Sequence, residues 1–280
     1  MKTAIITADD FGVSVEVNRA VEQAHREGVL TVTSLMVTGD AAADAVERAH
    51  ATPTLGVGLH VALAETPPAL PPSQIPDLVD ERGQFRIESL PVALALLARA
   101  SVRRQLEAEI EAQFALFEDT GLPLDHVNSH KHMHLHPVIG ATLLKVGLRH
   151  GMKALRAPIE ERASLAAFEP VTGLDIAKPF ARHIQRSGRA AGMKVPDRTF
   201  GLAWSGAMHA ARLRGILENL PEGVNEIYLH PATGTTPWPR QAINMKRNWP
   251  RCWIRKPVRS LRVTISDWRA SPISSGRKAP

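Results

Sequence analysis

Acidic and imidazole side chains follow several short apolar runs of this sequence, at the points where the runs end. Carboxylates come after the first run and histidines after the third and fourth runs: Asp9 and Asp10, then His60, then His130, His132, His134 and His136. Two imidazoles and a carboxylate form a mixed nitrogen and oxygen ligand set that suits Zn²⁺ or a similar divalent ion. The remaining coordination positions can hold water and substrate. The residue types therefore predict a divalent-metal site.

Each of these residues also has an ordinary structural interpretation. A pair such as Asp9-Asp10 can cap a loop, and a single buried histidine such as His60 can simply be hydrogen-bonded in the core. The segment SHKHMHLHP (129–137) can be a metal-scavenging surface tract. The joint occurrence of these residues after successive runs favours a site. The single cysteine, Cys252, excludes an internal disulfide framework and a cysteine-based zinc cluster.

The elements that must position these side chains alternate between strand and helix, which predicts parallel strands with helices outside. We expect strands over 2–8, 31–37, 55–61, 124–128, 153–156, 200–204 and 226–230, and helices over 16–27, 41–51, 101–120, 138–150 and 209–219. Residues 64–92 hold six prolines and predict a long loop suited to covering a substrate. The pattern favours an α/β fold with a (β/α) barrel, irregular or incomplete and TIM-like, whose strand ends meet on one face.

The bulk composition predicts one globular domain. A chain of 280 residues with 44% apolar and 22% charged residues can bury one substantial core. No apolar run approaches the roughly 18 residues needed to cross a bilayer. The N-terminus MKTAIITADD has no signal-peptide pattern, so we expect a cytoplasmic location.

The net charge of +6 does not predict a nucleic-acid partner, because it is unevenly distributed. Eleven of the 34 Lys and Arg residues but only one of the 28 acids lie from Arg240 onward. The chain before that point is mildly acidic. The chain from Trp238 onward also holds the only cysteine and four of the five tryptophans: Trp238, Trp249, Trp253 and Trp268.

Four motifs resemble those of one known enzyme family, in order and in spacing. TADDFG (7–12), GLH (58–60), NSHKHMH (128–134) and LHPA (229–232) resemble the YdjC/ChbG-like carbohydrate deacetylases, over residues 1 to about 234. PPSQIPDLVDERGQFR, RRQLEAEIEAQF and FGLAWSGAM are similar to the hopanoid-biosynthesis-associated, HpnK-type members. The resemblance implies a barrel of the glycoside hydrolase/deacetylase type.

The resemblance also implies roles for individual residues. Asp10, His60 and His130 would bind one divalent metal ion, Mg²⁺ or Zn²⁺. Asp9 would be the general base and His230 the general acid. Three further residues are expected to support the ligands or contact substrate: Asn128, His132 and Arg156. The family often has Asp where this chain has Asn128, which removes one charge from that support.

The implied reaction is hydrolysis of the acetamide of an N-acetylated amino sugar, with release of acetate. The implied substrate is an N-acetylglucosaminyl hopanoid lipid, with peripheral contact at the inner face of the membrane and a homodimer as further expectations. Three alternatives stay open: a chitooligosaccharide deacetylase, a metal-dependent phosphoesterase or glycosidase on the same barrel, and a non-catalytic metal- or lipid-binding protein.

The tail departs from the family pattern, which has a Tyr/Arg region, a Glu-Leu pair and a Leu-Leu-Asp-Pro turn. Codons read one base out of frame give Glu across Met245-Lys246, Leu across Cys252-Trp253 and Asp across Trp253-Ile254. We therefore expect residues 1–235 to form the deacetylase barrel and 236–280 to be an atypical, poorly ordered frameshift product. A basic membrane-contact tail is the alternative.

Overall fold

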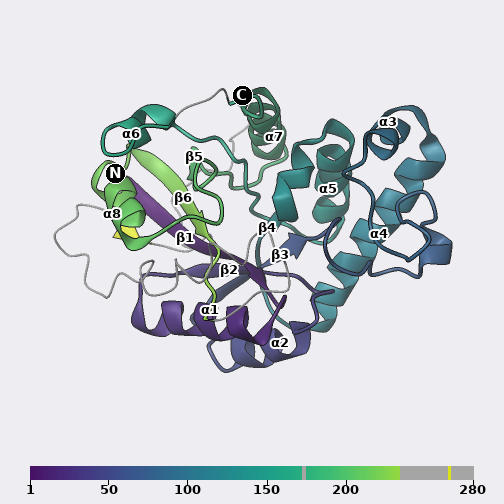
Figure 1. The fold of residues 1–280 in the computed structure, drawn as a ribbon, viewed down its shortest axis with the longest axis horizontal. Coiled ribbons are helices and arrows are strands. Elements are labelled where there is room, and N and C mark those ends of the chain that lie inside the picture. Colours follow the sequence, from purple (N-terminus) through teal and green to yellow (C-terminus); the bar gives the residue numbers. More distant parts are fainter. Residues whose placement is uncertain (172–174, 234–263, 266–280) are drawn as a thin grey trace.

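The computed structural model describes residues 1–171, 175–233 and 264–265. Its centre is a curled sheet of parallel strands in the order β4-β3-β2-β1-β6-β5, and β7 pairs with the start of β1 (Figure 1). The strands are β1 (Lys2–Phe11), β2 (Val32–Leu35), β3 (Gly56–Val61), β4 (Leu124–Ser129), β5 (Arg198–Phe200), β6 (Gly223–Leu229) and β7 (Thr264–Ile265).

Strand β1 lies in the middle of the sheet, and its sequence explains why. Its residues KTAIITADDF are all buried except Lys2, and a continuous β-branched and apolar run suits a parallel strand covered on both faces. It pairs with β6 over Lys2–Ala8 and with β2 from Thr7 onward. The register with β2 shifts between Ala8 and Phe11. The strand therefore becomes irregular where its two acidic residues stand.

Helices cover the outside of the sheet (Figure 1). Ser14 begins the first of them, because its Oγ accepts a hydrogen bond from the amide of Val17 at 3.3 Å. The helices are α1 (Val15–Glu27), α2 (Ala42–His50), α3 (Leu90–Ala98), α4 (Ala100–Asp119), α5 (Pro137–Arg149), α6 (Arg162–Ala166), α7 (Lys178–Ala190) and α8 (Ala210–Glu218), with 3-10 turns η1 (Pro72–Gln74) and η2 (His130–Leu135). In Figure 1, α1 and α2 lie below the sheet, while α4 and α5 lie to its right.

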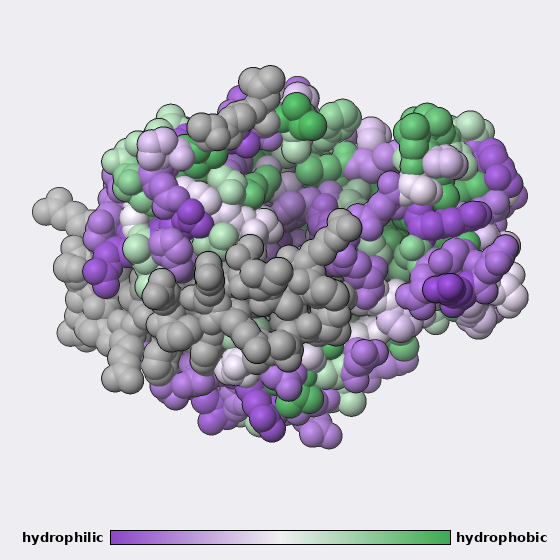
Figure 2. Space-filling view, viewed as in Figure 1, coloured by the Kyte–Doolittle hydropathy of each residue, from purple (hydrophilic) through white to green (hydrophobic). Residues whose placement is uncertain are grey.

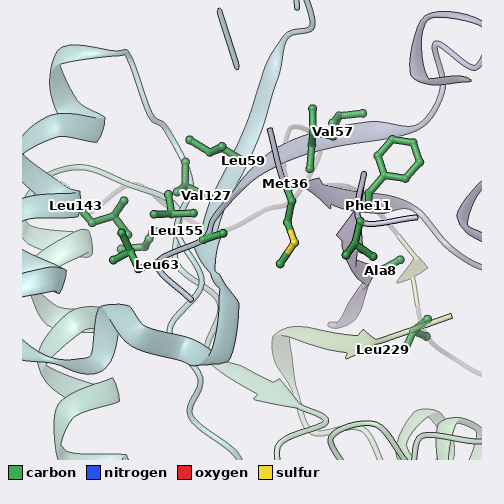
Figure 3. Close-up of a cluster of buried hydrophobic side chains, with 14 of the residues drawn as sticks. Ala8, Phe11, Met36, Val57, Leu59, Leu63, Val127, Leu143, Leu155 and Leu229 are labelled. Atoms are coloured by element: carbon green, nitrogen blue, oxygen red, sulfur yellow. The ribbon is translucent and has the colours of Figure 1, made fainter. Parts of the chain in front are cut away.

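Apolar side chains from strands and helices fill the space between the layers (Figure 3). Leu59 of β3 and Val127 of β4 lie near Leu155 and near Leu143 of α5 in one part of this core. Phe11 of β1 is fully buried in another part. Replacing a buried Phe by Ala costs about 3–5 kcal/mol. This core packs against the strands that carry the polar residues at their ends.

The predicted parallel α/β architecture is confirmed. Where the sequence predicts a barrel, the structure has a curled sheet of six strands, with β7 paired to β1. The predicted strand 153–156 forms only isolated bridges, which pair Val127 with Leu155 and Ala154 with Lys194. The predicted strand 200–204 is instead the short β5. The sequence pattern predicts no helix or strand between residues 160 and 198, and the structure has α6 and α7 there.

Helix α3 begins at the end of the predicted loop 64–92 and is apolar on most of its surface. Its sequence is LPVALALLA, of which Val92 and Leu96 point into the core. Leu90, Leu94 and Leu97 are 70%, 54% and 55% exposed, and Figure 2 shows apolar residues gathered over this part of the surface. No helix among the described residues combines the length and apolarity needed to span a membrane.

The predicted domain boundary near residue 235 and the predicted frameshifted, poorly ordered tail lie outside the described residues. The exception is β7, which pairs Thr264 with Thr3 and Ile265 with Ala4.

Candidate metal centre

Three side chains of the types that ligate metal ions lie close together in the interior, at the ends of three strands. Asp10 lies near the end of β1, His60 lies in β3, and His130 follows β4 directly. Nε2 of His60 lies 3.3 Å from Oδ1 of Asp10, and Nδ1 of His130 lies 3.2 Å from the same oxygen. One possible ligand atom from each residue lies within 4.8 Å of the other two. The parallel strands bring these residues together because their carboxyl ends lie at the same edge of the sheet.

The environment of Asp10 fits a bound cation. Its Oδ2 is buried and has no hydrogen-bond partner within residues 1–171, 175–233 and 264–265, and leaving such a group unsatisfied costs about 1–3 kcal/mol. Its φ of +67° is in the left-handed region, where a residue with a side chain is strained. Burial opposes ionisation of Asp10, but His130 and His60 outweigh it and hold its pKa well below the usual range. A divalent cation would satisfy this ionised oxygen.

The outer nitrogens of both histidines have partners that decide which nitrogen faces the centre. Nδ1 of His60 lies 2.5 Å from Oδ1 of Asn128 and 3.2 Å from Oγ of Ser34. An amide oxygen only accepts hydrogen bonds, so Nδ1 donates and Nε2 keeps its lone pair for the centre. Nε2 of His130 lies 2.9 Å from Oε2 of Glu65, which leaves Nδ1 for the centre.

Protonation of His130 competes with cation binding. Burial lowers the pKa of this imidazole, but the carboxylates of Asp10 and Glu65 outweigh burial and raise the pKa to about 9. A nitrogen must lose its proton before it ligates a metal, so the same atom serves either a proton or a cation.

Asp9 belongs to a buried ion cluster beside the three candidate ligands. Its two carboxylate oxygens accept hydrogen bonds from Nη1 and Nη2 of Arg156 at 2.6 and 2.9 Å. Arg156 also donates to Oε1 of Glu226, from Nε at 2.9 Å and from Nη2 at 2.7 Å. Ser34 and Asn128 donate to Oδ1 of Asp9 at 2.9 and 3.3 Å. We call Asp9, Arg156 and Glu226 the buried ion cluster.

The charge of Arg156 keeps Asp9 ionised. Burial alone would raise the pKa of Asp9, but Arg156, aided by His60, outweighs it and holds the pKa well below its usual range. Arg156 is itself fully buried. Its guanidinium is held between the carboxylates of Asp9 and Glu226.

His230 lies at the rim of the centre, after β6. Its Nε2 is 3.8 Å from Oδ2 of Asp10, and its side chain is 10% exposed. Burial lowers the pKa of His230, and the carboxylates of Asp10 and Asp9 oppose that effect only in part. The ring lies edge-on to that of Tyr228, with centroids 5.6 Å apart.

The histidine-rich segment does not form a surface metal-binding tract, because its four histidines have four different surroundings. His130 joins the centre, whereas Nε2 of His132 lies 3.1 Å from the hydroxyl of Tyr228. His134 is buried between Oγ of Ser129 and the carbonyl of Arg156, at 2.6 and 3.1 Å. His136 caps α5. Lys131 and His132 both have positive φ, of 52° and 53°, which turns successive side chains in different directions.

The structure brings together most of the residues selected from the sequence. Seven of them lie in or against the centre: Asp9, Asp10, His60, Asn128, His130, Arg156 and His230. His132 contacts Tyr228 instead. Sequence reasoning missed Glu65, Glu226 and Ser34. An acid in the buried strand EIYL was a clue to Glu226, because a buried carboxylate requires a partner.

The chain also matches the model of a known protein family. The family model described as YdjC-like protein matches residues 3–262. The chain therefore belongs to the YdjC-like family.

Relatives named carbohydrate deacetylase occur in bacteria and in an animal. The protein from Thermoanaerobacter pseudethanolicus is 27% identical over 83% of this chain and 82% of its own length. The protein from Mus musculus is 30% identical over 83% of this chain and 79% of its own length. The relative from Brevibacillus brevis is 40% identical, but the match spans only 51% of this chain and 54% of that protein.

A solved structure shares the fold. It is that of a putative cellobiose-phosphate cleavage protein from Enterococcus faecalis V583, which superposes with a TM-score of 0.72 at 23% identity. The match covers 96% of this chain and 98% of that one.

Proposed function

We propose that this chain is a divalent-metal-dependent hydrolase that removes the N-acetyl group of an amino sugar and releases acetate. The observation that carries the proposal is the cluster of Asp10, His60 and His130 directly beside the ionised Asp9. Hydrolysis of an unreactive amide needs both an electrophile and a proton acceptor. The names of the relatives supply the substrate class.

Asp10, His60 and His130 would hold the ion. Three protein ligands leave positions for water and for the acetamide oxygen. A bound divalent ion polarises the carbonyl and lowers the pKa of an adjacent water. Two imidazoles suit Zn²⁺ better than Mg²⁺, which prefers oxygen ligands.

Asp9 is the general base in this proposal. It accepts a proton from water as the water oxygen bonds to the acetamide carbon. Arg156 fixes the carboxylate with two hydrogen bonds, which removes the freedom to rotate away from the water. Arg156 also pairs with Glu226, so one guanidinium holds both carboxylates of the buried ion cluster in place.

His230 is the general acid. It donates a proton to the amine nitrogen as the carbon–nitrogen bond breaks, so that acetate and a free amine leave. Burial lowers the pKa of His230, so the ring gives up its proton readily. Its place at the rim gives it access to a leaving group that arrives from solvent.

We assign an N-acetylglucosaminyl hopanoid as the specific substrate within this proposal. Its support is the likeness of several motifs to the HpnK-type members, and a chitooligosaccharide is the competing substrate. Contact with a membrane surface and a homodimer belong to the same proposal.

We also propose that the sheet continues into an irregular TIM-like barrel. The support is the pair of bridges that link β4 through Leu155 and Ala154 to Lys194, four residues before β5.

An acetate-release assay tests the function. Chelated protein is supplied with Mg²⁺, Zn²⁺, Mn²⁺ or Co²⁺ and offered N-acetylglucosamine oligomers and an N-acetylglucosaminyl lipid. p-Nitrophenyl phosphate and p-nitrophenyl glycosides are offered in parallel. We expect metal-dependent acetate release, with the lipid preferred, and no release of p-nitrophenol.

A matched pair of variants controls this assay. His130→Ala should lose metal and acetate release, while His183→Ala, at an exposed position on α7, should keep both. Hydrolysis of the phosphate or glycoside without acetate release would overturn the proposal. Metal binding without any hydrolysis would favour a binding protein.

A further inference from the structure

Glu65 reaches the candidate metal centre from a loop rather than from a strand. It stands four residues after the end of β3, within the proline-rich segment predicted to cover the substrate. Its Oε2 lies 2.9 Å from Nε2 of His130, and its Oε1 lies 2.6 Å from Nζ of Lys131. The side chain is 31% exposed, so it lies where the buried centre meets solvent.

The backbone conformation of Glu65 is strained. Its φ of +61° is in the left-handed region, which a residue with a side chain adopts only when surrounding structure holds it there. The side chain points to His130 in this conformation. The strained backbone therefore occurs at the residue through which the loop contacts His130.

Two side chains of α4 hold this loop on both sides of Glu65. Before it, Gln113 accepts a hydrogen bond from the amide of Ala62 at 3.0 Å and donates one to the carbonyl of Ala62 at 2.7 Å. After it, Glu109 accepts from the amides of Ala69 and Leu70 at 2.9 and 3.0 Å.

The two side chains on α4 also bind each other. Gln113 donates to Glu109 at 2.8 Å, and both residues are buried, at 1% and 0% exposure. They stand one helical turn apart and so present one continuous polar patch to the loop. We call Glu109 and Gln113 the α4 clamp.

We infer that Glu65 is a positioning residue that fixes the orientation and tautomer of His130 for metal binding, and that the α4 clamp holds it in place. This inference rests on the proposed function, because it assumes that His130 is a ligand. When Nε2–H donates to the carboxylate, the lone pair of Nδ1 is aimed at Asp10 and the centre. A carboxylate behind an imidazole also makes the imidazole a stronger ligand, and loss of such a partner typically weakens metal binding about 10–100-fold.

Lys131 supplies a matched control for the effect of charge. Its Nζ pairs with Glu65 and also, at 3.1 Å, with Glu88, which is 54% exposed. Both acids contact the same lysine, but Glu65 is the one that also contacts Nε2 of His130, at 2.9 Å. Removing either charge changes the local potential, whereas only Glu65→Gln replaces the carboxylate behind the candidate ligand by a neutral amide.

The test is a titration of chelated protein with Co²⁺, followed by calorimetry and by visible absorption. We expect Glu65→Gln to raise the Kd for Co²⁺ about 10–100-fold and Glu88→Gln to leave it within about twofold. The positions of the Co²⁺ absorption bands should be the same in all three proteins, because the ligands themselves are unchanged. The metal-free melting temperature of Glu65→Gln should stay close to that of the wild type, which separates positioning from general stability.

Two results would overturn the inference. A Kd for Glu65→Gln equal to that of Glu88→Gln would show that the carboxylate does not support His130. Shifted absorption bands in Glu65→Gln would show that Glu65 is itself a ligand. Failure of the wild-type protein to bind Co²⁺ would instead reject the proposed metal centre, so the two failures are distinguishable.

Discussion

Asp9 and Asp10 are neighbours in sequence, but their carboxylates face different partners. Asp9 accepts two hydrogen bonds from Arg156, whereas Oδ1 of Asp10 lies within 3.3 Å of nitrogens of His60 and His130. Alternation along a strand accounts for only part of this difference. The register of β1 shifts at this point and Asp10 has a φ of +67°, so the strand is locally irregular.

The first prediction separates the two acids by metal content. Asp9→Asn should keep the metal and lose turnover about 10²–10⁴-fold, because an amide cannot accept the proton of water. Asp10→Ala should lose the metal, because it removes one of three ligands. Elemental analysis and acetate release on the same preparations check both statements. Equal metal content in the two variants would contradict the division of roles.

The second prediction concerns the stability supplied by Arg156. Arg156→Met leaves the carboxylates of Asp9 and Glu226 buried without their cation, which typically costs about 3–5 kcal/mol. Arg198→Met is the matched control, since Arg198 pairs with Glu161 at 2.8 Å but is 26% exposed. An exposed pair contributes about 0–1 kcal/mol. Urea unfolding of both variants measures the difference, and equal losses would show that the buried ion cluster is not a special contributor.

The strand pattern predicted that the acids after the first strand, His60 and the histidines from His130 onward would meet at one edge of the sheet, because parallel strands deliver their last residues there. The choice of Asp10, His60 and His130 among them came from the family resemblance. The strand pattern could not predict Glu65, whose position depends on hydrogen bonds from α4, 44 and 48 residues further along the chain. The barrel prediction was less complete, because residues 153–156 contribute single bridges in place of a strand.

The third prediction concerns pH and Glu160. Burial raises the pKa of this carboxyl above 4.5, although the amides of Gly201, Leu202 and Ala203 and the charge of Arg162 oppose the rise. The folded state then holds the proton more tightly than the unfolded state, so this group's contribution to stability falls as the pH rises from about 4.5 through the raised pKa.

Unfolding of wild type and Glu160→Gln by urea at several pH values tests this sign. The free energy of unfolding of the wild type, relative to the variant, should decrease as the pH rises through that window. Glu161→Gln, at the neighbouring position, is the control. A relative stability that increases with pH would show that Glu160 is instead stabilised as the ionised form.

The fourth prediction concerns the α4 clamp. Gln113→Ala removes both hydrogen bonds to Ala62 and should free the loop that carries Glu65. The Kd for Co²⁺ should rise, by less than in Glu65→Gln, because the carboxylate still reaches His130 part of the time. Gln105→Ala is the control, since Gln105 lies on the same helix and binds Asp77, further along the loop. Equal effects of the two variants on Kd would remove the specific role of the clamp.

The last prediction concerns Asn128, which lies between a candidate ligand and the proposed base. The amide oxygen lies 2.5 Å from Nδ1 of His60, while the amide nitrogen donates to Asp9 at 3.3 Å and to Ser34 at 3.2 Å. A single amide therefore accepts from a candidate ligand and donates to the proposed base. An ionised carboxylate could perform only the first of these tasks.

Asn128→Asp should consequently have opposite effects on the two neighbours. The new carboxylate still accepts from His60, so metal binding should be kept or strengthened. It cannot donate to Asp9, and it places a second negative charge beside a buried carboxylate, so stability should fall by about 1–3 kcal/mol. Co²⁺ titration and urea unfolding on one preparation measure both effects. Unchanged stability would mean that the donation from Asn128 to Asp9 contributes nothing, and that the amide serves His60 alone.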